Sequence, residues 1–168
     1  MWIIKLINYK NNLRFILLIS LFCFISSLVS QVLFDKIPCL LCLFTRYGFL
    51  IVSIGCIFTL YYIDKKNVVF LPLISIIFVL IFSFYHLGVE NHWWFAPEKC
   101  KTILPTLQEL QSTTQLIKNT RPPCDTVNFK IFGISMTLFS FIVSSFIFWM
   151  HSLSITLYLY TNYNENKL

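Results

Sequence analysis

The sequence predicts an all-α integral membrane protein, a four-helix bundle with a long loop that carries a short interfacial helix. Hydrophobic residues make up 57% of the chain and charged residues 12%, about half the charged share of an ordinary soluble domain. Four apolar runs are each close to the roughly 20 residues that a helix needs to cross a bilayer. The runs are too long for strands and do not alternate, so helices with internal hydrogen bonds are expected rather than a barrel.

The expected spans cover residues 15–34, 43–63, 68–89 and 131–151 of a single membrane domain, 1–168. The first run is too long for a typical signal-peptide core and lacks a small-residue exit, so we expect it to remain in the protein. The formal net charge is +6, but the basic residues flank the runs instead of forming one patch. A membrane surface explains this pattern more simply than nucleic acid does.

Four spans place both termini on one side and the two longer connections, residues 35–42 and 90–130, on the other. Four cysteines therefore face one compartment: Cys39, Cys42, Cys100 and Cys124. A dense basic cluster before the first span favours cytoplasmic termini under the positive-inside rule. Paired cysteines persist in oxidising compartments, which favours the outer side for the cysteine loops.

A Cys-x-x-Cys pair, Cys39 and Cys42, lies at the mouth of the second run directly after Pro38. Proline suits the first position of a helix, and the free N–H groups and dipole of a first turn favour thiolate. Arg46 is expected one turn deeper on the face of Cys42, where its cation would stabilise a Cys42 thiolate further. A charge at that depth is expected to be functional, because it is costly beside lipid.

The second cysteine pair, Cys100 and Cys124, lies on the long loop and is expected to be accessible. The weakly amphipathic stretch Pro105–Lys118 between them predicts a short helix on the membrane surface. Such a helix would hold the loop close to the Cys39–Cys42 mouth.

Two histidines lie near span ends. His86 and Glu90, one turn apart, have two interpretations: they face Cys42 and touch a bound head group, or they anchor the helix end beside an aromatic belt of Trp93 and Trp94. His151 is expected to meet solvent or lipid head groups at the end of the fourth span.

Two non-catalytic interpretations compete with redox chemistry. A structural zinc site could use four cysteines, but zinc sites usually have two compact ligand pairs, and Cys100 and Cys124 are not one. Structural disulfides would not explain Arg46 or the position of one pair at the membrane edge. We therefore expect no metal site, and we expect Cys23 and Cys56 within the spans to be inert apolar residues.

Three segments together are similar to a known family: Pro38-Cys39-Leu40-Leu41-Cys42 with Arg46, Tyr85-His86-Leu87-Gly88-Val89-Glu90, and Cys124-Asp125 followed by Phe132-Gly133-Ile134-Ser135-Met136. They resemble the DsbB family of bacterial disulfide-generating membrane proteins. The resemblance covers roughly Phe15 to Met150 and is specific through the combination of motifs.

The resemblance implies a quinone-dependent thiol-disulfide oxidoreductase with two redox disulfides, Cys39–Cys42 and Cys100–Cys124. Cys100 would form the mixed disulfide with a periplasmic thioredoxin-like oxidase of the DsbA type, and Cys124 would pass electrons to the inner pair. Cys42, helped by Arg46, would reduce a membrane quinone, either ubiquinone or menaquinone.

By the same resemblance, cofactor binding would involve Cys42 and Arg46, with His86 and Glu90 as further candidates. The protein would reside in the bacterial inner membrane, among lipid and the quinone pool, with cytoplasmic termini and periplasmic cysteine loops. A sibling branch with a dedicated partner stays open. A vitamin K epoxide reductase-like protein is disfavoured, because its quinone-proximal Cys-x-x-Cys falls late in the chain.

Overall fold

The computed structural model describes residues 2–34, 38–62, 66–97, 100, 122–125, 130–131 and 133–165. Its helices are α1 (Trp2–Phe34), α2 (Leu40–Tyr61), α3 (Phe70–Glu90) and α4 (Met136–Glu165), with a short 3-10 helix, η1 (Lys66–Val69), before α3. The strands β1 (Lys130–Ile131) and β2 (Ile134–Ser135) form a small antiparallel hairpin.

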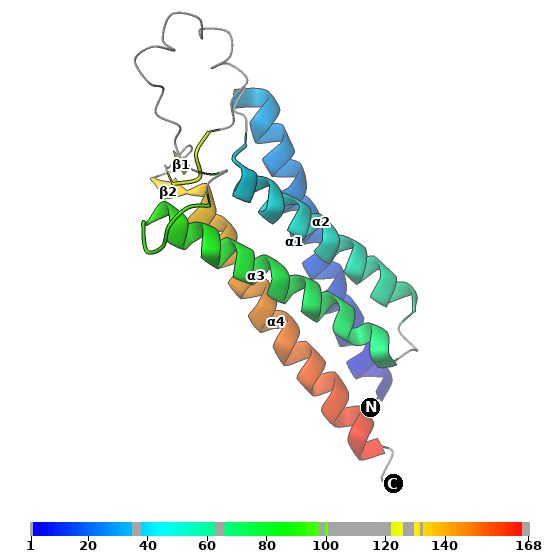
Figure 1. Cartoon of the computed structure of the whole chain (residues 1–168). Coiled ribbons are helices and arrows are strands. Elements are labelled where there is room, and N and C mark those ends of the chain that lie inside the picture. Colours follow the sequence, from blue (N-terminus) through cyan, green and yellow to red (C-terminus); the bar gives the residue numbers. More distant parts are fainter. Residues whose placement is uncertain are drawn as a thin grey trace, which may run out of the picture.

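Four helices in the described part of the chain are long and apolar enough to cross a membrane. The stretches are Asn8–Leu33, Leu40–Tyr61, Asn67–Glu90 and Met136–Tyr160. This confirms the prediction of an all-α membrane bundle. Each helix packs against the next along the chain, and α1 also packs against α4, which closes the bundle. The N- and C-terminal ends lie together at one end, opposite the start of α2 and the end of α3 (Figure 1).

The starts of α1 and α4 differ most from the predicted spans. Helix α1 begins at Trp2 rather than near residue 15, so the basic residues ahead of the apolar run belong to the same helix. Helix α4 begins at Met136 rather than at residue 131, because the β hairpin occupies the preceding residues. Gly133, with φ 82°, allows the hairpin turn, and the Ser135 hydroxyl accepts the Leu138 N–H at 3.2 Å as a cap. The predicted surface helix Pro105–Lys118 lies outside the described residues.

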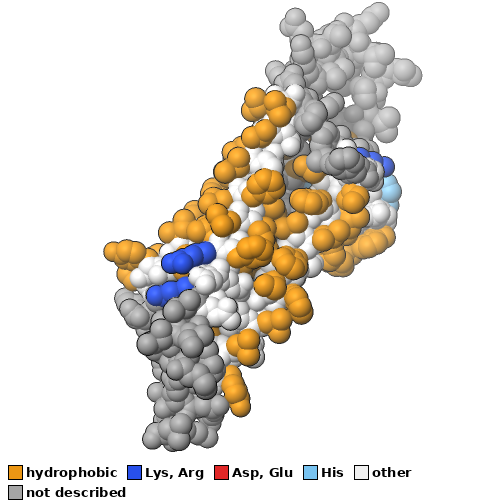
Figure 2. All heavy atoms as spheres, turned by 180° about the vertical axis from the view of Figure 1, so that it is seen from behind, with side chains coloured by type: hydrophobic (Ala, Val, Ile, Leu, Met, Phe, Trp, Pro, Cys, Tyr) orange, Lys and Arg blue, Asp and Glu red, His pale blue; other side chains and the backbone are white. Residues whose placement is uncertain are grey.

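The bundle is apolar both inside and outside. Its main core contains residues from every helix: Tyr9, Leu13, Ile16, Phe49, Val52, Cys56, Val69, Ile76, Val79, Ile147, Ile155 and Tyr158. Many large apolar side chains of the helices are exposed, and on the face shown in Figure 2 they cover the surface while Lys and Arg appear only toward the ends of the bundle. An outward-facing apolar surface of this extent fits contact with lipid.

Polar contacts join the helices across the core. The hydroxyls of Ser83 on α3 and Ser144 on α4 lie 3.0 Å apart. The Asn12 side chain on α1 donates to the Met150 carbonyl on α4 at 3.3 Å. Hydrogen bonds of this kind replace the water that is absent from a bilayer, and they fix which helix faces meet.

The expectation for His151 was wrong. The residue is fully buried, and its ring lies 6.1 Å from that of Tyr9. The reason is that α4 continues to Glu165, so His151 lies within the helix instead of at its end. The aromatic sequence that continues to Tyr160 carries the helix onward.

Candidate active site

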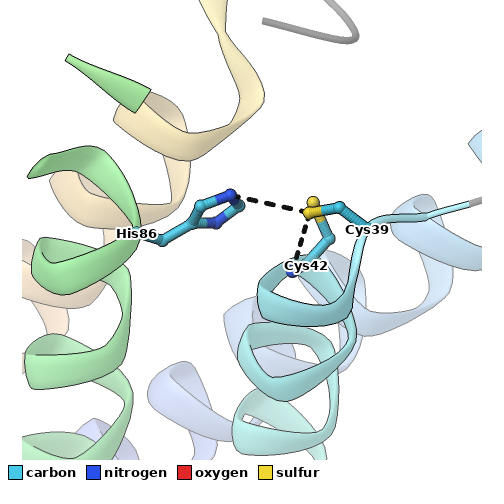
Figure 3. Close-up of side chains that lie close together, drawn as sticks. All are labelled: Cys39, Cys42 and His86. Carbon is cyan, nitrogen blue, oxygen red and sulfur yellow. Dashed lines mark hydrogen bonds between the residues drawn. The ribbon is translucent and has the colours of Figure 1, made fainter. Parts of the chain in front are cut away.

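The cap of α2 brings the first cysteine pair together. Cys39, not Pro38, is the N-cap residue, so the proline lies outside the helix instead of at its first position. The Cys39 sulfur accepts the backbone N–H of Cys42 at 3.2 Å, as the dashed line in Figure 3 shows. A Cys-x-x-Cys spacing places the second cysteine at the third helical position, where N-cap side chains find their donor. The cap therefore holds both sulfur atoms at the helix start.

Arg46 is buried, and its guanidinium reaches across to α1. It donates from Nε to the Ser27 hydroxyl at 2.9 Å, from Nη1 to Gln31 Oε1 at 2.7 Å, and from Nη2 to the Ser27 carbonyl at 3.0 Å. These acceptors are neutral, and no carboxylate among the described residues pairs with Arg46. Its positive charge therefore remains available near the helix start, where it favours an anion.

His86 on α3 faces the same cysteines. Its Nε2 lies 3.6 Å from the Cys39 sulfur, and the imidazole points toward both sulfur atoms (Figure 3). The ring is buried, with 5% of its surface exposed. Of the two interpretations of His86, the structure favours the one in which it faces the cysteine site.

The two loop cysteines lie against this pair. Cys100 and Cys124 pack in a cluster with Cys39, Leu41 and Val89. Only 1% of each loop cysteine is exposed, so the expectation that this pair is accessible was wrong. The backbone N–H of Cys124 donates to the Cys100 carbonyl at 2.9 Å, which holds the two residues side by side.

The four cysteines of the site belong to one packed cluster. All six cysteines of the chain are free thiols in the structure. Cys39, Cys100 and Cys124 are buried together, and Cys42 packs against them. The sulfur atoms of Cys39 and Cys42 lie within 4.8 Å of each other. Cysteines packed this closely are near the arrangement that thiol–disulfide exchange needs.

The surroundings keep three of these thiols protonated at neutral pH. A hydrogen bond with Cys124 lowers the pKa of Cys39, but the bond with Cys42 and burial outweigh it and raise the pKa to about 12. Burial, followed by the contact with Cys124, raises the pKa of Cys100 to about 12. The pKa of Cys124 is raised, first by its bond with Cys39 and then by burial. For Cys39, the helix start alone therefore does not produce a thiolate.

The end of α3 covers the cluster. His92 adopts a positive φ of 58°, and the N–H groups of His92 and Trp93 return to the carbonyls of Val89 and Gly88 at 3.2 and 2.8 Å. This is the Schellman pattern that ends many helices, with histidine where glycine is usual. The chain then folds back so that the Trp94 indole donates to the Tyr85 carbonyl at 2.8 Å.

Gly88 allows Trp94 to lie against α3. A Cβ atom at this position would overlap the indole ring, so the close approach requires glycine. Trp94 stacks on Tyr85 with ring centroids 5.9 Å apart, and both pack against the cysteine cluster. Trp93 is exposed, with 60% of its surface accessible, so only Trp93 of the two fits the predicted aromatic belt.

A pocket of about 90 Å³ opens beside Cys42 and is lined by all four membrane helices. Its lining residues are Cys23, Ser26, Ser27, Cys42, Thr45, Arg46, Phe49, His86, Met136, Thr137, Phe139 and Ser140. Of the four clustered cysteines, only Cys42 is among the described residues that line the pocket. Glu90 is half-buried at the end of α3 and is not among the described lining residues.

Sequence reasoning missed the α1 side of this pocket. Ser27 and Gln31 hold Arg46, and Cys23, expected to be inert, lines the pocket one turn away. A signal was present, because Ser27 and Gln31 are polar residues four apart near the end of an apolar run. Cys56, by contrast, is fully buried in the core, as expected.

Cys39, Cys42 and His86 together have the composition of a metal site. The ligand atoms of Cys39, Cys42 and His86 all lie within 4.8 Å of one another. The zinc alternative invoked four cysteines, whereas this group combines one cysteine pair with a histidine from another helix.

A family model described as "Disulfide bond formation protein DsbB" matches residues 10–153 of the chain. No significant match was found among curated proteins or among solved structures. The matched segment contains all four clustered cysteines together with Arg46 and His86.

Proposed function

The chain belongs to the DsbB family of disulfide bond formation proteins, and we propose that it reoxidises a thioredoxin-like oxidase of the DsbA type with a membrane quinone as acceptor. The family and the four apolar helices make it a multi-pass membrane disulfide oxidoreductase. The choice of partner, the acceptor and the role of each residue are parts of the proposal.

The observation that supports the proposal is the packing of the four cysteines in one cluster, with Cys42 beside the pocket. We propose that electrons enter at Cys100, pass through Cys124 and Cys39, and leave from Cys42. In this scheme the partner dithiol reduces the Cys100–Cys124 disulfide through a mixed disulfide at Cys100. Cys124 then attacks Cys39, which releases Cys42 as a thiolate. Each exchange passes two electrons inward and breaks one disulfide for each disulfide formed.

The pocket suits the head group of a quinone. About 90 Å³ is small beside the roughly 300–1,000 Å³ of pockets that enclose whole ligands, so a ring fits while its apolar tail lies among the helices and lipid. Arg46 provides a cation near Cys42, and Phe49 provides an apolar wall. A bound quinone supplies an acceptor for two electrons and two protons.

The chain's own residues supply position and charge. Arg46 stabilises the thiolate that Cys42 becomes when its disulfide opens, because an unpaired cation acts strongly in a site of low polarity. His86 contacts Cys39 and lines the pocket, so it is placed to relay a proton between thiol and acceptor. We assign no role to Glu90 beyond its electrostatic interaction with His86.

A strongly oxidising acceptor is needed for thermodynamic reasons. An oxidase of the DsbA type has a reduction potential of about −120 mV, and 30 mV corresponds to about 1.4 kcal/mol for a two-electron couple. A glutathione pool near −200 mV cannot reoxidise it, whereas a respiratory quinone can. We therefore propose that the cysteine end faces the bacterial periplasm and the termini face the cytoplasm, because paired cysteines persist in oxidising compartments.

The burial of the loop pair adds one requirement. Cys100 is 1% exposed, so an incoming partner thiolate cannot reach it in the conformation described here. We propose that the segment after α3, which packs Trp94 against the cysteine cluster, opens when the partner docks. The rate of the first exchange would then depend on this opening.

The experiment is a quinone-reduction assay with purified protein, a short-chain quinone and a reduced thioredoxin-like partner, followed by the quinone absorbance. Turnover is expected in the wild type and should disappear in Cys39→Ser and in Cys100→Ser. Turnover that persists in either variant would remove that pair from the electron path. Absence of turnover with several partners and quinones would overturn the proposal.

A further inference from the structure

The group Cys39, Cys42 and His86 has a geometry that the redox scheme does not require. The imidazole Nε2 and the Cys39 sulfur are 3.6 Å apart, and all three ligand atoms lie within 4.8 Å of one another. All three residues are buried or half-buried, on two different helices. The ligands are thus brought together by helix packing, and they point into one small space (Figure 3).

The spacing matches tetrahedral coordination. A zinc ion binds sulfur at about 2.3 Å and histidine nitrogen at about 2.0–2.1 Å, so the two ligand atoms on one ion lie about 3.6 Å apart. The observed nitrogen–sulfur distance is 3.6 Å. Two thiolates and an imidazole are also the ligand types that borderline and soft cations prefer over hard ones.

We propose that the reduced protein binds one thiophilic divalent cation, Zn²⁺, through Cys39, Cys42 and His86. Binding converts the two thiols to thiolates and releases two protons, while the imidazole binds as the neutral form. The ion and two thiolates have no net charge, which limits the cost of placing them at the membrane edge. A water molecule completes the coordination.

The site exists in one redox state only. A Cys39–Cys42 disulfide uses the same two sulfur atoms, so the ion and the disulfide exclude each other. Bound Zn²⁺ would therefore hold the inner pair reduced and stop electron transfer. The binding does not depend on the proposed function, whereas inhibition of turnover does.

The test is a Zn²⁺ titration of the full chain in detergent, reduced with a phosphine, in competition with a chromophoric chelator. One ion per chain and release of about two protons are expected for the reduced protein, and no binding after oxidation of the pair. Co²⁺ in place of Zn²⁺ should give the visible bands of a tetrahedral thiolate site. Equal binding by reduced and oxidised protein, or no binding at all, would overturn the proposal.

Matched variants locate the ion. His86→Ala should weaken Zn²⁺ binding by about 100-fold or more, because loss of an outer partner alone costs about 10–100-fold. His92→Asn, an exposed histidine at the same end, should bind as the wild type does. If His86→Ala does not fold, Cys42→Ser serves instead, with Cys56→Ser as its control. Wild-type affinity in a folded His86→Ala or Cys42→Ser protein would exclude this group as the site.

The readout separates the two proposals. Zn²⁺ affinity is measured without quinone or partner, so binding in a protein that shows no quinone turnover would support the metal site alone. Quinone turnover in a protein that binds no Zn²⁺ would support the redox function alone.

Discussion

The two ends of the bundle each bury a histidine, and they use it differently. At the cysteine end, His86 faces the Cys39 sulfur and lines a pocket. At the end that carries the termini, His151 packs against Tyr9, and neither ring nitrogen has a hydrogen-bond partner in the described structure. The Tyr9 hydroxyl also has no hydrogen-bond partner among the described residues.

This comparison shows that burial of a polar side chain does not by itself mark a functional site. Both histidines are at most 5% exposed. What distinguishes His86 is a reactive neighbour and an opening beside it, whereas His151 is enclosed by the core. Three of the predictions below set a residue of the cysteine end against a counterpart elsewhere in the bundle.

The largest difference is expected between Cys42 and Cys56. Cys42→Ser should lower quinone reduction by at least about 1,000-fold, because a hydroxyl cannot supply the activated sulfur nucleophile. The Cys100–Cys124 disulfide should stay reducible by the partner. Cys56→Ser changes a core residue outside the pocket and should keep most of the activity. Wild-type turnover in Cys42→Ser would contradict the assignment of Cys42.

Thiol reactivity should show the raised pKa of Cys39 and Cys100. Both pKa values are about 12, against about 8.5 for an ordinary thiol. Below its pKa a thiol gains thiolate about tenfold per pH unit, so alkylation at pH 8 should be about 1,000-fold slower than for an ordinary thiol. The rate should still rise between pH 9 and 10. Site-resolved mass spectrometry measures this, and a plateau by pH 9.5 would contradict it.

Arg46 and Arg14 form the next pair. Arg46→Ala removes a buried cation and three hydrogen bonds to α1, so the KM for quinone should rise about 10–100-fold. Arg14 is exposed and bonds only to Asn11 within the described residues, so Arg14→Ala should leave KM unchanged. Steady-state kinetics with varied quinone decides, and equal KM values for both variants would remove Arg46 from the quinone site.

Substitutions at Gly88 and Gly55 test whether the packing of Trp94 against α3 depends on Gly88. Gly88→Ala would push Trp94 away from α3 and should lower the free energy of unfolding by about 1–3 kcal/mol. Cys100 should then react faster with alkylating reagents. Gly55→Ala places its Cβ 3.4 Å from the Ser75 hydroxyl and should change stability much less. Equal thermal stability of the two variants would mean that Trp94 does not depend on Gly88.

The smallest effect is expected at His151. His151→Leu removes two buried nitrogens that have no partner and should raise the free energy of unfolding by about 1 kcal/mol. Quinone turnover should not change, because the residue is outside the pocket. Chemical unfolding and the quinone assay check the two statements. A destabilised variant would show that the imidazole makes a contact of its own.

Sequence reasoning anticipated the parts of the site that depend on local pattern. The Cys-x-x-Cys spacing at the start of an apolar run indicated a cysteine pair at a helix start, although Cys39 is the cap residue and Pro38 lies outside the helix. The face shared by Cys42 and Arg46 followed from helical periodicity. The partners of Arg46 could not be anticipated, since Ser27 and Gln31 lie on a different helix and meet it only through packing.

By itself the sequence determined the class of the protein, the number of helices and the gathering of four cysteines at one end of them. These features depend on hydropathy, run length and an even number of spans, which are properties of consecutive residues. Only the tertiary structure decided that the loop cysteines are buried, that His86 faces Cys39, and that the His151 nitrogens have no hydrogen-bond partner among the described residues. Those outcomes depend on which helix faces meet, and the meeting faces come from segments far apart in the chain.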